Sequence, residues 1–168
     1  MSDVLPPTMR QWVLAHRPVG VATVDDFRLE AVPVPEIGDG EVLLKTLYLG
    51  VAPVMLRYMT NETSFEKPIE IGDVMIGRGV GRVAASRNPA YRVGEIYQAK
   101  LGWREYAVID GDPYYMPFRM QHTDLPLSHG ISTLAMSGFT ALIGMQEICA
   151  VSAKDRVVVS GAAGGVGS

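Results

Sequence analysis

Glycines at three-residue spacing near the C-terminal end are the clearest candidates for chemistry in this sequence. Gly161, Gly164 and Gly167 fit the pattern G-x-x-G-x-x-G, with Gly165 as an extra glycine, and they directly follow the β-branched run 156–160. Small residues let a backbone approach a pyrophosphate, and the N–H groups at the start of a following helix can hold its negative charge. The turn therefore predicts dinucleotide binding, with a tight packing point of the backbone as the alternative.

The residues alone leave the choice between NAD and NADP open. In dinucleotide-binding units, an acidic or basic residue about 20 positions after the glycine turn makes that choice. That position lies beyond Ser168, the last residue of the sequence. The turn thus predicts a dinucleotide without saying which one.

Side chains that hold metals in proteins are few here and are badly spaced. A catalytic zinc needs three N, S or O ligands in fixed geometry, and a structural zinc usually takes several cysteines. The sequence has one cysteine, Cys149, and its histidines, His16, His122 and His129, show no spacing such as H-x-x-x-H. We therefore expect no metal site, with Cys149 as a small buried residue and the histidines at the surface or in loops.

Strands are the expected support for a site in the first 125 residues. Short runs of alternating or clustered apolar residues are separated by Gly, Pro and Asp, as in a small β-barrel. Gly77, Gly79 and Gly81 occupy alternate positions of one run and indicate bends or a close backbone approach. We predict a compact, barrel-like β domain over residues 1–125, with strands within 10–14, 27–32, 41–49, 76–86, 91–99 and 103–109.

The pattern changes after Pro126. Residues 137–149 contain no proline and place apolar side chains at helical spacing. The β-branched run 156–160 is typical of a buried parallel strand, and the glycine turn follows it. We predict that residues 126–168 begin an α/β Rossmann domain with its first helix, strand and glycine turn.

Composition excludes several classes of protein. Of the 168 residues 48% are hydrophobic, which is enough for a packed core, and 15 Lys and Arg against 18 Asp and Glu give a net charge of −3. This balance offers no basic field for nucleic acid or an anionic membrane. A single cysteine excludes an internal disulfide framework and fits a reducing compartment. The N-terminus does not read as a signal peptide, and no run of about 18 apolar residues occurs, so we expect a cytoplasmic protein.

Taken together, the strand-rich first part, the helix and the glycine turn resemble the medium-chain dehydrogenase/reductase superfamily. The resemblance runs from residue 11 to residue 167 and is closest to the zinc-independent, NADPH-dependent alkenal/one oxidoreductases, the leukotriene B4 12-hydroxydehydrogenase or prostaglandin reductase group. The blocks that carry it are VMIGRGVGRV at 74–83, GWREYAV at 102–108, GFTA at 138–141 and SGAAGGVGS at 160–168.

This resemblance implies a GroES-like catalytic domain followed by a Rossmann domain, with NADPH and a small-molecule enone or enal between them. Such enzymes transfer a hydride to the β-carbon of an α,β-unsaturated ketone or aldehyde, and a hydrogen-bond donor must stabilise the charge on the carbonyl oxygen. The resemblance assigns the pyrophosphate to Gly164, Gly165, Val166 and Gly167, and it places Thr140 near the nicotinamide. It also implies a homodimer, and it leaves the proton donor unidentified.

Departures from the family pattern bear on the substrate pocket. Residues 52–57 read APVMLR where the family has D-P-Y-M-R, and Leu142 replaces the aromatic residue that ends G-L-T-A-Y. Both changes make the expected cleft less polar and less aromatic. We assign Met55 and Tyr58 to the substrate pocket, with Tyr58 as a replacement for the lost hydroxyl. Zinc is not expected here either, because Ala52 and the residues at 76–78 occupy the Cys and Gly-His-Glu positions of zinc alcohol dehydrogenases.

Other tyrosines have structural interpretations. Tyr48 alternates within a predicted strand, so we expect it in the core. Tyr114 and Tyr115 lie between two prolines and fit either plain packing or a contact between domains or subunits.

Three functions remain open from the sequence. The first is the N-terminal part of an NADPH-dependent reductase of C=C bonds, which we expect to be inactive by itself because half of the cleft lies outside these residues. The second is a quinone oxidoreductase of the same superfamily. The third is a stand-alone GroES-like binding module without catalysis.

Overall fold

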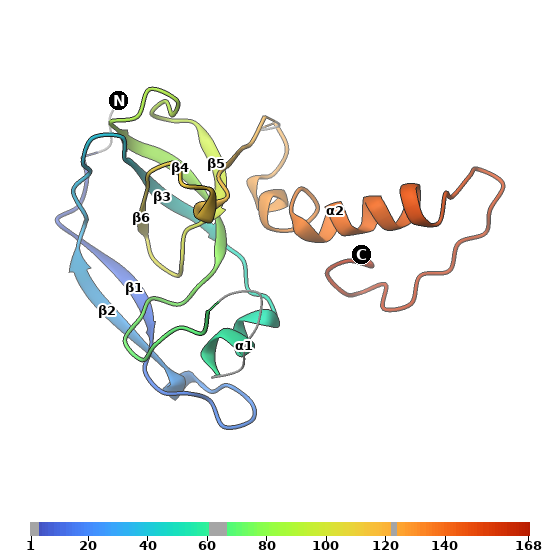
Figure 1. Ribbon diagram of the computed structural model, residues 1–168, viewed down its shortest axis with the longest axis horizontal. Coiled ribbons are helices and arrows are strands. Elements are labelled where there is room, and N and C mark those ends of the chain that lie inside the picture. Colours follow the sequence, from blue (N-terminus) through green and yellow to red (C-terminus); the bar gives the residue numbers. More distant parts are fainter. Residues whose placement is uncertain (1–3, 61–66, 122–123) are drawn as a thin grey trace.

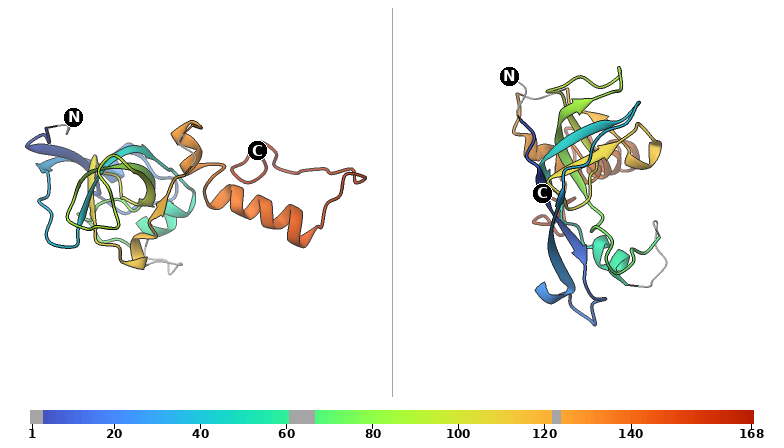
Figure 2. Two further views of the ribbon diagram at one scale, coloured as in Figure 1. Left: turned by 90° about the horizontal axis from the view of Figure 1, so that it is seen from above. Right: turned by 90° about the vertical axis from the view of Figure 1, so that its left-hand side faces the viewer.

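The computed structural model describes residues 4–60, 67–121 and 124–168. A β-rich body forms one end of the molecule, and a helix with the C-terminal segment extends away from it (Figure 1; Figure 2). The predicted fold class, a mostly β domain followed by a helical segment, is confirmed. In the described part of the chain, every helix is too short or too polar to cross a membrane.

Two antiparallel sheets make up the β body. β1 (Thr8–Leu14) pairs with β2 (Phe27–Pro33). A second sheet has the strand order β6-β3-β4-β5-β7. Its strands are β3 (Val42–Leu49), β4 (Arg78–Ser86), β5 (Ile96–Lys100), β6 (Tyr106–Ile109) and β7 (Phe118–Arg119). Isolated bridges from Gln11 to Arg104 and from Val13 to Val74 tie β1 to the loops of the larger sheet. The body is thus a pair of linked open sheets rather than a closed barrel.

Each strand predicted within residues 1–125 corresponds to one strand of the structure, with shorter bounds in the longer runs. The glycines of the run at 76–86 explain how closely β3 and β4 approach. A Cβ atom added at Gly79 would lie 2.6 Å from the backbone oxygen of Tyr48, and one at Gly81 would lie 3.2 Å from Leu44 Cβ. Only glycine allows this approach, so the close contact expected from the spacing is confirmed.

The core of the body lies on the larger sheet and beneath a short helix. One cluster, around Leu44, Tyr97 and Ile109, covers a face of the five-stranded sheet. A second cluster joins Leu14 on β1 to Met59 at the end of α1 (Val54–Met59). The sequence analysis did not predict α1.

Two 3₁₀ turns, η1 (Val24–Asp26) and η2 (Pro113–Tyr115), interrupt the loops of the body. A third, η3 (Leu127–Ile131), leads from the body to α2 (Met136–Ile143), which continues as a π-helical turn at Gly144–Ile148. These two segments match the helix predicted at 137–149. Their apolar side chains are exposed, and Phe139 is 63% exposed.

The strand expected at 156–160 is not formed, and its residues are exposed. A strand needs hydrogen-bonded neighbours, and within the described residues none of the named strands pairs with this run. Cys149 is also exposed rather than buried, because it ends a helical segment with no buried residue. Both expectations assumed packing partners that the described residues do not provide.

Tyr48 corrects another expectation, because it is 42% exposed. A register irregularity between Thr46 and Tyr48 interrupts the pairing of β3 with β4. Such a bulge shifts the alternation of side chains between the two faces of a strand. The period of the sequence therefore predicted the wrong face for Tyr48.

Candidate functional site

The glycine turn is compact and depends on its glycines. The N–H of Gly164 donates to the carbonyl oxygen of Gly161 at 2.8 Å, and the N–H of Ser168 donates to that of Gly164 at 3.1 Å. Gly161 has a φ of +65°, a conformation that favours glycine. A Cβ atom at Gly167 would lie 2.5 Å from the oxygen of Gly161. The turn therefore tolerates little more than hydrogen at position 167.

The residue types of this turn fit a pyrophosphate, because its backbone is unobstructed by side chains. A Cβ atom at Gly165 would meet only Ser137 Oγ, at 3.6 Å. Gly165 thus lies beside the start of α2, and small residues there leave room for an anion against backbone N–H groups. The backbone N–H groups of Gly164 and Ser168 already donate within the turn. An anion would therefore be held by other backbone N–H groups of the turn.

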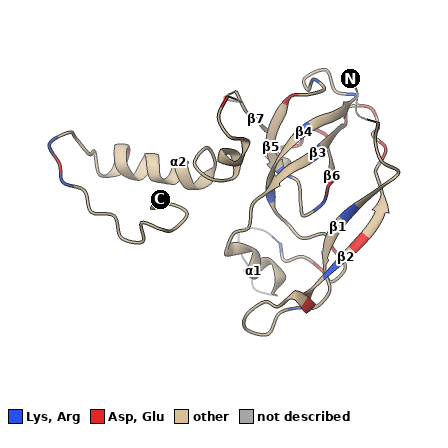
Figure 3. Ribbon diagram, turned by 180° about the vertical axis from the view of Figure 1, so that it is seen from behind, with Lys and Arg blue, Asp and Glu red and all other residues tan. Residues whose placement is uncertain are grey.

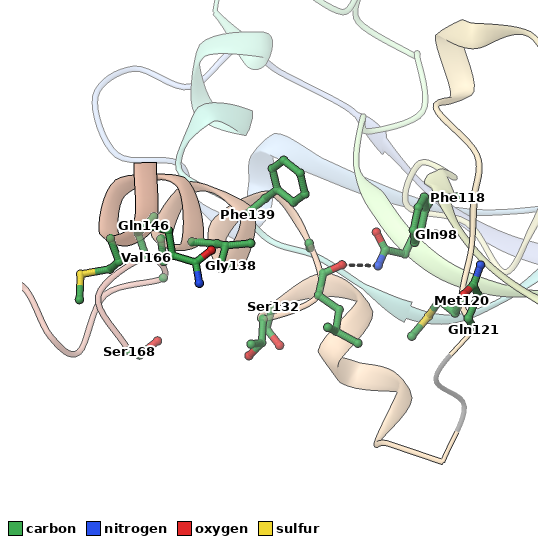
Figure 4. A pocket seen from close by; sticks show the side chains of 17 residues that line it. Gln98, Phe118, Met120, Gln121, Ser132, Gly138, Phe139, Gln146, Val166 and Ser168 are labelled. Carbon is green, nitrogen blue, oxygen red and sulfur yellow. Dashed lines mark hydrogen bonds between the residues drawn. The ribbon is translucent and has the colours of Figure 1, made fainter. Parts of the chain in front are cut away.

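A pocket of about 700 Å³ lies between the β body, α2 and the glycine turn (Figure 4). Gln98 on β5 and Phe118 on β7 form one wall, and Phe139 lies on the α2 wall. The side-chain amide of Gln98 donates to the backbone oxygen of Leu134, which fixes the segment before α2 against β5. The pocket is lined by Gln98, Phe118, Met120, Gln121, residues 132–135, Gly138, Phe139, Ala141, Leu142, Met145, Gln146, Gly165, Val166 and Ser168.

No acidic or basic side chain occurs among the described residues that line this pocket. Its polar groups are the amides of Gln98, Gln121 and Gln146 together with Ser and Thr hydroxyls and the backbone. Mostly apolar walls with a few neutral polar groups suit an uncharged organic molecule. The pocket is therefore chemically matched to a neutral apolar ligand.

The structure brings only some of the predicted cofactor residues to this pocket. Gly165 and Val166 line it, whereas Gly164 and Gly167 lie in the same turn without lining it. Thr140 is exposed on α2, and its hydroxyl donates to the backbone oxygen of Met136 at 2.8 Å. That bond leaves the Thr140 oxygen available only as an acceptor.

The predicted substrate residues lie elsewhere, on α1. Met55 and Tyr58 are both 8% exposed and belong to the buried face of that helix. Neither lines the pocket at the glycine turn. A Cβ atom at Gly77 would lie 3.4 Å from Met55 Cε and 2.8 Å from Cδ1 of Trp103. Met55 therefore packs close to the Gly77 backbone and the Trp103 indole.

Sequence reasoning missed the wall of the pocket that the β body supplies. Gln98 carried a sequence signal, because it is the single amide among the residues IYQAK of β5. The structure buries it, with 5% of its surface exposed. Buried amides in strands need a partner from another segment. Phe118, 60% exposed beside it, carried no comparable signal.

Tyr114 and Tyr115 pack within the β body. Their rings meet edge to face with centroids 5.4 Å apart, and Lys100 Nζ lies 4.3 Å from the centre of the Tyr114 ring. Arg104 donates through Nε to the backbone oxygen of Leu101 at 2.7 Å, and its burial lowers the pKa of its guanidinium. Burial also raises the pKa of Tyr115. Tyr114 is still 55% exposed, so about half of its surface is not packed against the β body.

The described residues contain no group of three or more His, Cys, Asp or Glu side chains that could hold a metal ion. His16 is exposed, and its Nδ1 lies 3.0 Å from the backbone oxygen of Asp25. His129 is half-buried in η3. His122 lies outside the described residues. The absence of a metal stays an expectation.

Comparison with known proteins assigns a class to this architecture. Residues 10–116 match the protein family described as the N-terminal domain of oxidoreductase. An antiparallel β body, followed by a helix and a glycine turn, is the arrangement expected of such an enzyme's first part. The chain belongs to this family, and its expected place in the medium-chain dehydrogenase/reductase superfamily is confirmed.

Particular relatives extend the match beyond this domain. The chain is 38% identical over 159 residues to the NADPH-dependent curcumin reductase of Escherichia coli (strain K12), covering 95% of this chain and 45% of the relative. It is 40% identical over 159 residues to prostaglandin reductase 1 of Bos taurus, covering 95% and 46%. The crystal structure of CurA in complex with NADPH from Vibrio vulnificus matches with a TM-score of 0.81 and 36% identity, over 94% of this chain and 46% of that chain. The chain spans about half the length of the curated relatives it matches.

Proposed function

We propose that the protein containing this chain uses NADPH to reduce the C=C bond of α,β-unsaturated ketones or aldehydes. The observation that carries the proposal is the glycine turn, which lies beside α2 and helps to line an uncharged pocket. Similarity to an NADPH-dependent curcumin reductase over 95% of the chain supports the choice of cofactor and reaction. A neutral enone suits a pocket without ionised side chains.

Each predicted site residue has a proposed role in this reaction. Backbone N–H groups around Gly164, Gly165, Val166 and Gly167 would hold the pyrophosphate, and Thr140 would lie at the nicotinamide end. NADPH, when bound, supplies the hydride. The pocket wall around Gln98 would exclude water from the reacting carbons. Met55 and Tyr58 stay proposed substrate residues on α1, although they lie outside the pocket at the glycine turn.

A chimera tests the proposal, because the chain covers only part of its relatives. Residues 1–168 are joined to the remainder of the Escherichia coli curcumin reductase, and NADPH oxidation is followed with an enone and with a quinone. We expect oxidation with the enone. Oxidation with the quinone alone would favour the quinone oxidoreductase instead. A folded chimera that is inactive with both, beside an active Escherichia coli enzyme, would favour a binding module.

The glycine turn is tested in the same chimera. Gly167→Val puts a side chain where a Cβ atom would lie 2.5 Å from the oxygen of Gly161. We expect the KM for NADPH to rise by about tenfold or more, which corresponds to about 1.4 kcal/mol of lost binding. Gly144→Ala is the matched control, because nothing lies within 4 Å of its added Cβ atom. An unchanged KM in the Gly167 variant would remove the turn from the cofactor site.

We also propose a cytoplasmic homodimer. One cysteine fits a reducing compartment, and the dimer follows from the resemblance to the superfamily. Analytical ultracentrifugation of the chimera would show a dimer, and a fluorescent fusion in cells would show its location. A chimera that stays monomeric at all concentrations would contradict the homodimer. A fusion that is exported would contradict the cytoplasmic location.

A further inference from the structure

A second hollow, which the proposed reaction does not use, lies on the five-stranded sheet. Its volume is about 980 Å³, and it is lined by basic side chains from separate segments. These are Lys45 on β3, Arg82 on β4, Arg92 in the β4–β5 loop and Arg119 on β7. Glu95 is the one acidic residue among the described residues that line it. We call this hollow the basic groove; it concentrates positive charge in a chain whose net charge is −3.

Strand pairing holds two of these cations close together. Lys45 on β3 lies directly opposite Arg82 on β4. Like charges in opposite positions of an antiparallel pair repel each other and destabilise it. Arg119 lies at the edge of the sheet on β7, opposite Tyr97 of β5. An anion between these side chains would relieve that repulsion.

Glu95 neutralises only part of this charge. Its carboxylate pairs with Arg119 Nη2 at 3.0 Å and accepts hydrogen bonds from the backbone N–H of Arg92 at 3.2 Å and the hydroxyl of Tyr97 at 3.1 Å. The bond from the Arg92 backbone is the main cause of its lowered pKa. Within the described residues, no carboxylate forms an ion pair with the side chains of Lys45, Arg82 or Arg92.

The smaller sheet shows the contrasting arrangement. Basic and acidic positions are interspersed on β1 and β2 (Figure 3). Arg10 pairs with Glu105 at 2.6 Å, and Arg28 pairs with Glu30 at 2.7 Å. Exposed arginines of this chain are therefore often compensated by a neighbouring carboxylate, which makes the excess charge of the basic groove a distinct local feature.

We propose that the basic groove binds a small polyanion, a molecule with two or more phosphate or carboxylate groups. Planar guanidinium groups match both anions with paired hydrogen bonds. The volume of the groove lies within the range of small-molecule sites. Apolar side chains of Ile96, which is 8% exposed, and of half-buried Leu127 also line the groove, and low-dielectric walls of this kind strengthen the attraction. Met120 and Gln121 line both this groove and the pocket at the glycine turn, so the two hollows adjoin.

Calorimetry of the 168-residue chain with pyrophosphate, and separately with citrate, tests the proposal. We expect saturable binding that weakens between about 0.01 M and about 0.1 M salt, where the Debye length falls from about 30 Å to about 10 Å. The double substitution Arg82→Gln with Arg92→Gln should weaken binding by about tenfold or more. Both residues are exposed, so the fold should survive, which circular dichroism would check.

Matched controls separate the groove from other anion sites. Arg28→Gln removes a guanidinium outside the groove and should leave the affinity unchanged. The backbone amide signals of Gly94 and Glu95, which line the groove, should shift in nuclear magnetic resonance spectra on titration. Binding that persists in the double variant, with shifts at residues 161–168 instead, would place the anion at the glycine turn and overturn the proposal. Binding to anionic vesicles that pyrophosphate fails to displace would also overturn it, in favour of a lipid surface.

Discussion

Gly77 illustrates how a residue without a side chain positions an aromatic ring. A Cβ atom at this position would lie 2.8 Å from Cδ1 and 2.9 Å from Nε1 of Trp103. The indole also stacks on the Phe27 ring, with the two centroids 5.6 Å apart. Its Nε1 is buried and has no hydrogen-bond partner among the described residues. The ring therefore has little freedom to move away from position 77.

Gly77→Ala should lower the free energy of unfolding by about 1–3 kcal/mol, because the new methyl group overpacks this contact. Urea denaturation followed by tryptophan fluorescence measures the change. Gly144→Ala, at a position with open space around its Cβ, should change stability by less than about 1 kcal/mol. Equal stability of the two variants would mean that the Trp103 ring is not fixed over Gly77.

The contact of Arg10 with Glu105 predicts a pH dependence of stability. The guanidinium of Arg10 donates to Glu105 Oε1 from Nε at 2.9 Å and from Nη2 at 2.6 Å, and its backbone N–H donates to Oε2 at 2.7 Å. These bonds, the side-chain bonds first, lower the pKa of Glu105 in the folded chain. A carboxyl group whose pKa is lowered by folding stabilises the fold above its unfolded pKa, and this contribution is lost as the pH falls through the folded pKa.

Glu105→Gln should therefore destabilise the chain at about pH 7 and approach the stability of the unsubstituted chain below about pH 4. Urea midpoints across this range give the measurement. Glu36→Gln, at an exposed carboxyl group, serves as the control. A destabilisation by Glu105→Gln that stays constant with pH would show that the carboxylate charge is not what matters.

At this scale the sequence predicts parts of the candidate site and misses others for physical reasons. Gly165 belongs to a glycine pattern that is visible locally, whereas Val166 was assigned through the resemblance, and both line the pocket. Gln98 and Phe118 were not predicted, because their place depends on how β5 and β7 face α2. Met55 and Tyr58 came from the resemblance alone, and the structure places them on α1, outside that pocket.

Among the elements, η3 connects the β body to α2. Gly130 is buried, and a Cβ atom there would lie 2.5 Å from Val80 Cγ2. Leu127 and Ile131 pack against the cluster of Val80, Ile96 and Met120. The division of domains at residue 125 stays a prediction, and these contacts offer a way to test it, because they join residues after 125 to the core of the β body.

Ile131→Ala should lower the free energy of unfolding of the β body by about 1–2 kcal/mol, since it removes partly buried apolar surface. Thermal unfolding followed by circular dichroism in the β region measures it. Ile148→Ala, at a side chain that is 77% exposed, should change stability by no more than about 0.5 kcal/mol. No effect from Ile131→Ala would support a β body that ends at 125.

Elements were predictable where their pattern is local and repeated. Alternating apolar residues gave β1 to β6, because one face of each strand packs on the core. Helix α1 was missed although Met55, Tyr58 and Met59 stand at helical spacing, because six residues are too few for a period to be recognised. The run at 156–160 has the residues of a strand, but no strand of the described residues pairs with it. Pairing depends on a neighbouring strand and is not a property of the run itself.

For the whole molecule, α2 and the C-terminal segment expose apolar side chains that the described residues do not cover. Phe139, Ile148 and Val158 are 63%, 77% and 94% exposed. Large apolar patches on a soluble protein mark a surface that another segment covers. Under the proposed function, the half of the relatives' length that this chain does not match would supply the segments that cover it.

The reactivity of Cys149 can show whether another segment covers this surface. Cys149 is the single cysteine of the chain and is exposed within the same region. A thiol reagent should modify it in the 168-residue chain at the rate of a free thiol. The comparison is the chimera with the second half of the Escherichia coli relative, in which that half's own cysteines are replaced by serine. In this chimera we expect modification of Cys149 to slow by about tenfold or more. A covered thiol reacts only when local opening exposes it, and each factor of ten in rate corresponds to an opening cost of about 1.4 kcal/mol. Unfolding the chimera in urea should restore the rapid rate, which excludes chemical loss of the thiol. Equal rates in the folded chimera and the 168-residue chain would mean that the added half does not cover the end of α2, and the exposed surface would then need another occupant.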